Sequence, residues 1–108
     1  MTRPPNGLYF RGVSTKGTAV AEASVKVYVV AGGRLLKHRG RRDAPDVRAV
    51  LEALRERFGA DFGRDVYDGT LKDEQVLLLN DRALRDDDLD TPLSDGDVLF
   101  LFTAISGG

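Results

Sequence analysis

The chain has 108 residues, of which 42% are hydrophobic, and it carries a formal net charge of −1 and no cysteine. This size suits one domain with a compact core and excludes a large enzyme with a deep interior cleft. The near-neutral charge gives no general attraction to nucleic acid or to a membrane, and the missing cysteines exclude disulfides, a cysteine nucleophile and thiolate metal sites. No apolar stretch approaches the ~18 residues of a membrane span and no signal-peptide core is present, so we expect a cytoplasmic protein.

At the N-terminus, residues 1–24 differ in character from the remainder. Pro4–Gly7 is typical of a turn or an extended segment, and Leu8–Phe10 could form a short strand. The residues from Gly12 to Ser24 are mostly small and show no clear periodicity. We expect a flexible N-terminal extension, which either stays disordered or docks on the domain or on a partner.

The first two predicted strands form a hairpin. Val25–Val30 is β-branched and aromatic, Gly32-Gly33 permits a tight turn because glycine accepts positive φ, and Arg34–His38 can return as the second strand. Val25–Val30 does not alternate strictly between apolar and polar residues, and neither does the later run Val98–Phe102. We therefore expect both to be central strands that are buried on both faces.

Residues 45–58 show the clearest helical pattern. Asp43 or Asp46 can cap its N-terminus, and Gly59 can end it in the left-handed conformation. The apolar residues that share one helix face are Val47, Val50, Leu51, Leu54 and Phe58.

The second half of the chain contains further strand candidates. We expect Phe62, Val66 and Tyr67 to lie in a loop that folds under the sheet. The later elements are the strand Gln75–Leu79, an Asn80-Asp81 turn, the short edge strand Arg82–Leu84, a loop anchored by Leu89 and Leu93, the turn Ser94–Asp97 and the strand Val98–Phe102.

The predicted order is strand, strand, helix, strand, short strand, strand. One amphipathic helix across one face of a mixed sheet of four to five strands buries the apolar stripe of the helix. This α+β arrangement is a ubiquitin-like β-grasp. We expect the β-grasp domain over residues 25–102 and a flexible tail over residues 103–108.

The sequence offers no constellation for catalysis. His38 is the only histidine, which excludes a multi-histidine metal site. Asp86–Asp88 and Asp90 fall in a surface loop that lacks the glycine and the distal glutamate of a calcium site. No glycine-rich motif of the familiar ATP-binding type occurs. We expect no enzyme activity, no bound metal and no bound cofactor.

A basic run occupies the second strand of the hairpin and the residues after it. Its members are Arg34, Lys37, Arg39, Arg41 and Arg42. These side chains could contact phosphates, but no stacking Phe, Tyr or Trp is interleaved with them. We interpret the run as a solvated hairpin and expect no nucleic-acid partner and no membrane partner.

One helix cannot cover both faces of a five-stranded sheet. Side chains among Tyr28, Leu36, Leu78 and Phe100 are then expected to be partly exposed on the opposite face. Exposed apolar patches often mark protein–protein sites. We expect Leu78, Phe100 and Phe102 to contact a partner, and the competing interpretation is that the N-terminal extension covers this face.

The chain ends in Ser106-Gly107-Gly108, shortly after its last apolar run. These residues have almost no side chain, so a terminal carboxylate on such a tail can reach into a narrow active site of another protein. The competing interpretation is a frayed end, where glycine is tolerated.

The segment Leu89–Val98, the apolar strand that follows it and the terminal Gly107-Gly108 resemble a known family. They resemble the ubiquitin-like sulfur carriers MoaD and ThiS, and they are also similar to the small archaeal modifier proteins. The resemblance covers about residues 25–108. It departs from the family pattern in the tail, because Thr103–Ser106 contains no proline.

The resemblance implies a carrier that other enzymes load. A ubiquitin-activating-like adenylyltransferase would use ATP to activate Gly108, and a sulfurtransferase or persulfide donor would leave a thiocarboxylate there. Ile105, Ser106 and Gly107 would form the tail, with glycine letting the backbone pass through a tight channel. A sulfur-accepting enzyme, such as the large subunit of a molybdopterin synthase, would discharge the carrier, which we expect to be a monomer when free.

The receiving pathway and the acceptor stay open at this point. Molybdopterin synthesis is the first choice, with thiazole donation, tRNA thiolation or a specialised pathway as alternatives. A second hypothesis is a protein modifier joined through Gly108 to target lysines. A third is a binding module in which the terminal glycines are incidental.

Overall fold

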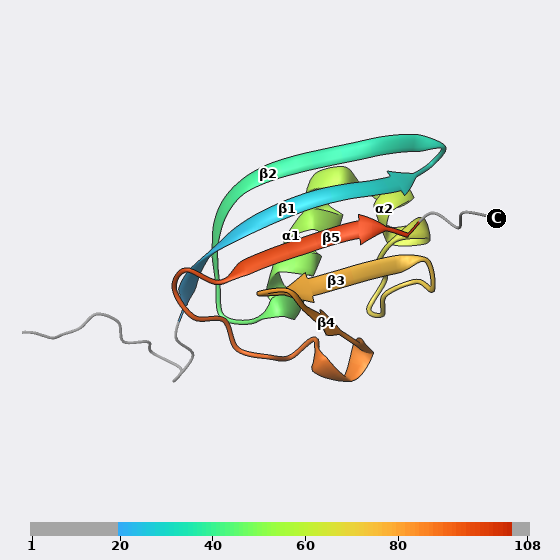
Figure 1. The fold of residues 1–108 in the computed structure, drawn as a ribbon. Helices are drawn as coiled ribbons and strands as arrows, with labels where there is room; N and C mark the ends of the chain where they lie inside the picture. Colours follow the sequence, from blue (N-terminus) through green and yellow to red (C-terminus); the bar gives the residue numbers. More distant parts are fainter. Residues whose placement is uncertain (1–19, 105–108) are drawn as a thin grey trace, which may run out of the picture.

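Five strands form one mixed sheet, and the helices lie on one of its faces (Figure 1). The computed structural model describes residues 20–104. The strand order is β2-β1-β5-β3-β4, with β1 and β5 parallel and the other neighbours antiparallel. The elements are β1 (Ala21–Ala31), β2 (Arg34–Ala44), α1 (Val47–Phe58), α2 (Ala60–Asp65), β3 (Gln75–Leu79), β4 (Arg82–Leu84), a short 3₁₀ helix (Asp86–Asp88) and β5 (Val98–Thr103). The predicted α+β β-grasp fold is therefore confirmed.

The β1–β2 hairpin is longer than its sequence pattern predicts. β1 begins at Ala21, so residues 21–24, which we had assigned to the N-terminal extension, belong to the sheet. β2 continues past His38 to Ala44, which pairs with Ala21. The added residues are small or charged and carry a weak strand signal, and an edge strand tolerates charges because one side of it is open. The short strand proposed at residues 8–10 lies outside the described residues.

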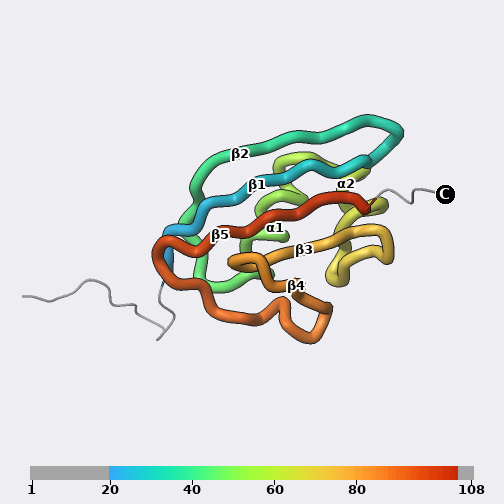
Figure 2. Tube along the Cα trace, in the orientation of Figure 1, coloured from blue at the N-terminus to red at the C-terminus, as the bar shows by residue number. Residues whose placement is uncertain are grey.

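The expectation that β1 and β5 are buried on both faces was wrong. Burial alternates strictly along β1, where every odd-numbered residue from Ala21 to Ala31 is buried. The helices cover only that face, so apolar residues at even positions stay accessible, and Tyr28 is 44% exposed. Figure 2 shows β1 and β5, blue and red, side by side in the middle of the sheet.

Helix α1 forms where the apolar spacing predicts it. Asp46 is its cap, because the Asp46 carboxylate accepts a hydrogen bond from the Ala49 N–H at 2.9 Å. Gly59 follows the helix with φ 87°, a conformation that favours glycine. The following segment is the six-residue helix α2 rather than a loop, because so short a helix shows no full period in the sequence. Phe62 is nevertheless fully buried, as expected for a segment that packs under the sheet.

The Asp95-Gly96-Asp97 turn links the start of β1, the β3–β4 turn and the start of β5 through side-chain hydrogen bonds. The Asp95 carboxylate accepts a hydrogen bond from the Glu22 N–H at 2.8 Å, next to the start of β1. The Asp97 carboxylate accepts one from the Asn80 amide at 2.9 Å, and the Asn80 amide oxygen accepts one from the Val98 N–H. These bonds set where β5 starts relative to β1 and to the β3–β4 turn.

The loop before this turn anchors the start of α1. Leu89 and Leu93 are buried, as expected of the residues that anchor this loop. The Leu89 carbonyl accepts a hydrogen bond from the Arg48 N–H, and the Leu93 N–H donates to the Pro45 carbonyl. Within residues 20–104 no helix is long and apolar enough to cross a membrane.

Candidate functional site

The sheet face opposite α1 carries an exposed apolar cluster. Figure 1 shows α1 behind the sheet, with no helix over the front face. Leu78 of β3 pairs with Phe100 of β5, and Phe102 pairs with Tyr28 of β1. Leu78, Phe100 and Phe102 are half-buried, and Tyr28 is exposed. The three residues that we expect to contact a partner are thus brought together on one face, which we call the open face.

Aromatic contacts hold this cluster in a defined shape. The Tyr28 and Phe100 rings meet edge to face at 6.1 Å between centroids, and the Phe100 and Phe102 rings are 4.9 Å apart. The Lys26 ammonium lies 5.2 Å from the Phe100 ring centroid. Such contacts stabilise side chains beyond the area that they bury, so the open face presents a preformed apolar surface.

Leu36 does not belong to this face, contrary to expectation. It pairs with the buried Val29, so it projects to the helix side and packs against the core. Its neighbour Leu35 is 56% exposed. Adjacent strand residues point to opposite faces, and only the register of the hairpin decides which of the two leucines points inward.

The end of β5 is held by hydrogen bonds to β1, to β3 and to the residue before β3. Thr103, which we had assigned to the flexible tail, is the last residue of β5. Its hydroxyl accepts a hydrogen bond from the Val30 N–H at 2.9 Å and donates one to the Gln75 side chain at 2.8 Å. The Ala104 N–H then donates to the Glu74 carbonyl at 2.8 Å. The backbone is therefore held in place up to Ala104.

The predicted tail residues Ile105, Ser106, Gly107 and Gly108 lie outside the described residues. Four residues span at most about 14 Å when extended.

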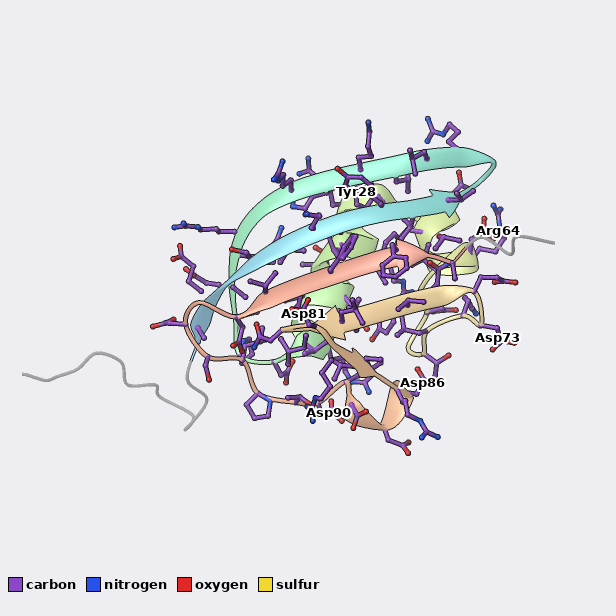
Figure 3. The ribbon with its side chains drawn as sticks, in the orientation of Figure 1. Tyr28, Arg64, Asp73, Asp81, Asp86 and Asp90 are labelled. Carbon is purple, nitrogen blue, oxygen red and sulfur yellow. The ribbon has the colours of Figure 1, made fainter. Side chains whose placement is uncertain are left out.

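Charged residues surround this held end. A hollow of about 380 Å³ beside Thr103 is lined in part by Arg64, Asp65 and Lys72. Arg64 donates hydrogen bonds to Asp65 and, with the Gly32 N–H, lowers the pKa of that carboxyl to about 2. The same pairing raises the pKa of Arg64. Figure 3 shows Arg64 near the C-terminal end of β5, so both signs of charge lie beside this end.

Comparison with known proteins assigns the family. Residues 36–108 match the model of the ThiS family. The chain belongs to the ThiS family. The match includes the Asp95-Gly96-Asp97 turn, β5 and the terminal Gly107-Gly108. The resemblance inferred from these motifs is confirmed, and no curated protein sequence matches the chain.

Solved structures agree with this family. The small archaeal modifier protein 1 from Methanosarcina acetivorans is 25% identical with a TM-score of 0.59, covering 82% of this chain and 98% of that one. The same protein from Haloferax volcanii is 30% identical with a TM-score of 0.57, covering 82% and 100%. A putative molybdopterin converting factor subunit 1 from Pyrococcus furiosus is 23% identical with a TM-score of 0.54, covering 79% and 99%, and shows the fold alone.

In this ThiS-family chain the acidic segment after β4 supports the fold. Asp86 accepts a hydrogen bond from the Leu71 N–H at 2.8 Å. Asp90 pairs with Arg48 at 2.8 Å, and Figure 3 shows Asp86 and Asp90 on this segment. Sequence reasoning placed these carboxylates in a surface loop, and they are exposed there, but their partners could not be found from sequence because they are distant in the chain. Over the described range, no group of three or more His, Asp or Glu side chains is placed to hold a metal ion.

The single histidine lies on the helix side of β2. Its ring contacts Phe58 edge to face at 6.4 Å. Burial lowers the pKa of His38, and the nearby charges of Arg57 and Arg42 lower it further. His38 therefore favours its neutral form and stands apart from the open face.

Proposed function

We propose that this ThiS-family chain is a sulfur carrier protein whose Gly108 is converted to a thiocarboxylate by partner enzymes. The observation that carries the proposal is the family match over residues 36–108, which includes the terminal glycine pair. The β-grasp body is the handle in this scheme, and Gly108 carries the sulfur atom.

The chemistry needs an activating partner because a carboxylate is a poor electrophile. In an adenylyltransferase, an oxygen of the Gly108 carboxylate attacks the α-phosphorus of ATP, and pyrophosphate leaves. The terminal sulfur of a persulfide donor attacks the resulting acyl-adenylate, and AMP leaves. This step forms a carbon–sulfur bond and gives an acyl persulfide. A second thiol then attacks the inner sulfur of the donor and breaks the sulfur–sulfur bond that the persulfide already held, which leaves the thiocarboxylate on Gly108 and a disulfide between the donor sulfur and that thiol.

The open face is the proposed docking surface for these partners. Phe100, Phe102 and Leu78 supply an apolar centre, and large half-buried aromatic residues contribute strongly to binding energy at interfaces. Thr103 supports this role, because a held end of β5 presents the tail from one fixed point. Free of partners, the carrier is proposed to be a monomer in the cytoplasm.

The second candidate function is a protein modifier. The 30% identity with the small archaeal modifier protein 1 from Haloferax volcanii favours it. Both functions share the acyl-adenylate on Gly108. They differ in the acceptor, which is a sulfur nucleophile for the carrier and a lysine amine for the modifier.

Mass spectrometry of the chain purified from its native cells tests the proposal. A carrier shows a C-terminal mass increase equal to the exchange of one oxygen for one sulfur atom. A modifier is instead joined through Gly108 to lysines of other proteins, and because the last basic residue is Arg85, trypsin leaves residues 86–108 attached to those lysines. The control is the chain without Gly108, which must lose either signal. Intact, unmodified chain in cells that hold an activating enzyme contradicts both functions.

Molybdopterin synthesis is the proposed destination of the sulfur, with thiazole, thiolated tRNA and specialised products as alternatives. The resemblance of Leu89–Val98 and the terminal Gly107-Gly108 to MoaD supports this order. Deleting the gene and measuring each product in the same cells separates the pathways. Loss of the molybdenum cofactor alone supports the first choice, and loss of another product overturns it.

A further inference from the structure

Two like charges face each other on the open face. In the antiparallel register of β1 and β2, Lys26 lies directly opposite Arg39, and both residues fall at open-face positions. Like charges directly opposite each other destabilise an antiparallel pair. Natural sequences keep local choices consistent with their fold, and exceptions are expected at functional sites. Glu22 also lies opposite Asp43 in this hairpin, but Glu22 contacts Arg41 at 3.7 Å. Among residues 20–104 the Lys26–Arg39 pair has no such ion-pair contact, so this pair calls for an explanation outside the stability of the sheet.

Further cations flank this pair on β2. Lys37 and Arg41 lie at open-face positions on either side of Arg39. Among residues 20–104, no carboxylate lies within salt-bridge distance of Lys26, Lys37 or Arg39. Arg41 has one contact with Glu22, at 3.7 Å between two exposed side chains, and such pairs contribute little. The positive charge of this region is thus left for an external anion.

A shallow hollow of about 390 Å³ adjoins the opposed pair, and we call it the basic hollow. All charged side chains that line it are positive. It borders the apolar cluster, because Lys26 also lies over the Phe100 ring. The lining residues at open-face positions are Ser24, Lys26, Arg39, Arg41 and Val98.

We propose that the basic hollow receives carboxylate side chains from an acidic segment of the protein that docks on the open face. The identity of this protein as a loading or sulfur-accepting enzyme rests on the proposed function. A carboxylate between Lys26 and Arg39 replaces their repulsion with two attractions, and arginine can bind it through two parallel hydrogen bonds. Complementary charge beside an apolar centre speeds association and selects the partner.

A polyanion such as nucleic acid fits this region less well. The whole chain is slightly negative, which opposes binding to a long phosphate backbone. The Lys26 ammonium already lies over the Phe100 ring, in a position that a stacked base would have to take. A short acidic protein segment therefore matches the hollow better than a nucleic acid strand.

The test is an NMR titration of isotope-labelled full-length chain with hexaglutamate peptide at low ionic strength, where surface charges are least screened. We expect amide shifts confined to the basic hollow. Arg39→Glu should abolish them, whereas the matched control Arg82→Glu, an exposed charge reversal on β4, should leave them unchanged. Shifts spread over all exposed cations, or equal losses in both variants, overturn the proposal. A thymidine hexanucleotide that binds the hollow more tightly than the peptide also overturns it.

Stability gives a second readout that needs no partner. Arg39→Glu converts the opposed pair into opposite charges, so its thermal midpoint should rise above that of the wild-type chain. An unchanged or lower thermal midpoint would show that repulsion between Lys26 and Arg39 does not destabilise the sheet. Neither measurement involves Gly108. The proposal for the basic hollow can therefore be overturned while sulfur is still found on Gly108. Conversely, sulfur can be absent from Gly108 while the hollow still binds the peptide.

Discussion

The hydroxyl oxygen of Thr103 accepts a hydrogen bond from the backbone N–H of Val30 at 2.9 Å, across 73 positions of sequence. The parallel pairing of β1 with β5 ends at Tyr28 and Phe102. Past that point, the Thr103 side chain takes the place of a strand partner for Val30. This contact closes the sheet around the end of β5 and determines where the tail leaves it.

Thr103→Val removes the hydroxyl while keeping the β-branched shape. The Val30 N–H and the Gln75 side chain then lose a partner, so we expect the free energy of unfolding to fall by about 1 kcal/mol. Chemical denaturation measures this loss, and faster hydrogen exchange at the Val30 amide localises it. Thr103→Ser keeps the hydroxyl and serves as the control. Unchanged exchange at Val30 in the valine variant contradicts the contact.

Asn80→Ala tests the hydrogen bonds that join the β3–β4 turn to the start of β5. Asn80 has φ 51°, and its side chain bonds to Asp97 and to the Val98 N–H. Alanine loses both bonds and is strained at this φ, so we expect a loss of about 2 kcal/mol in urea denaturation. Asn80→Gly loses the bonds without the strain and should cost less. Equal losses for the two variants argue against the strain contribution.

Phe100→Ala tests the open face as the docking surface. The side chain is half-buried and lies outside the core, so the variant should remain folded while losing about 1 kcal/mol from its aromatic contacts. We expect the fraction of chain that carries sulfur on Gly108 in cells to fall sharply. Val20→Ala, at an exposed position before β1, is the control. Normal loading of the folded Phe100 variant means that partners dock elsewhere.

The lowered pKa of Asp65 predicts that the stability of the region near the held end of β5 decreases in acid. Its pKa is lowered from 3.8 to about 2, first by the hydrogen bonds from Arg64 and then by the Gly32 N–H. A lowered carboxyl pKa contributes stability above about pH 4, which is lost as the pH falls from there towards 2. NMR titration of the side-chain carboxyl measures the value directly. Arg64→Ala should move the pKa of Asp65 back towards 3.8, and an unchanged value means that Arg64 is not the main cause.

Sequence patterns predicted the elements whose signal is local. The apolar spacing in residues 47–58 defined α1, and the β-branched and leucine-rich runs defined the cores of β1, β3 and β5. The ends of the hairpin were missed, because Ala21–Ser24 and Arg39–Ala44 become strands only by pairing across the hairpin. Helix α2 was missed because six residues are too few to show a period.

The sequence by itself determined the family, through the turn Asp95–Asp97, the strand after it and the terminal Gly107-Gly108. It also required an open apolar face, because one main helix cannot cover both sides of five strands. Only the tertiary structure decided that Leu35 rather than Leu36 lies on that face, that Thr103 bonds to Val30 and that Lys26 opposes Arg39. The physical reason is register: a shift of one residue in strand pairing reverses every side chain, and no local propensity encodes it.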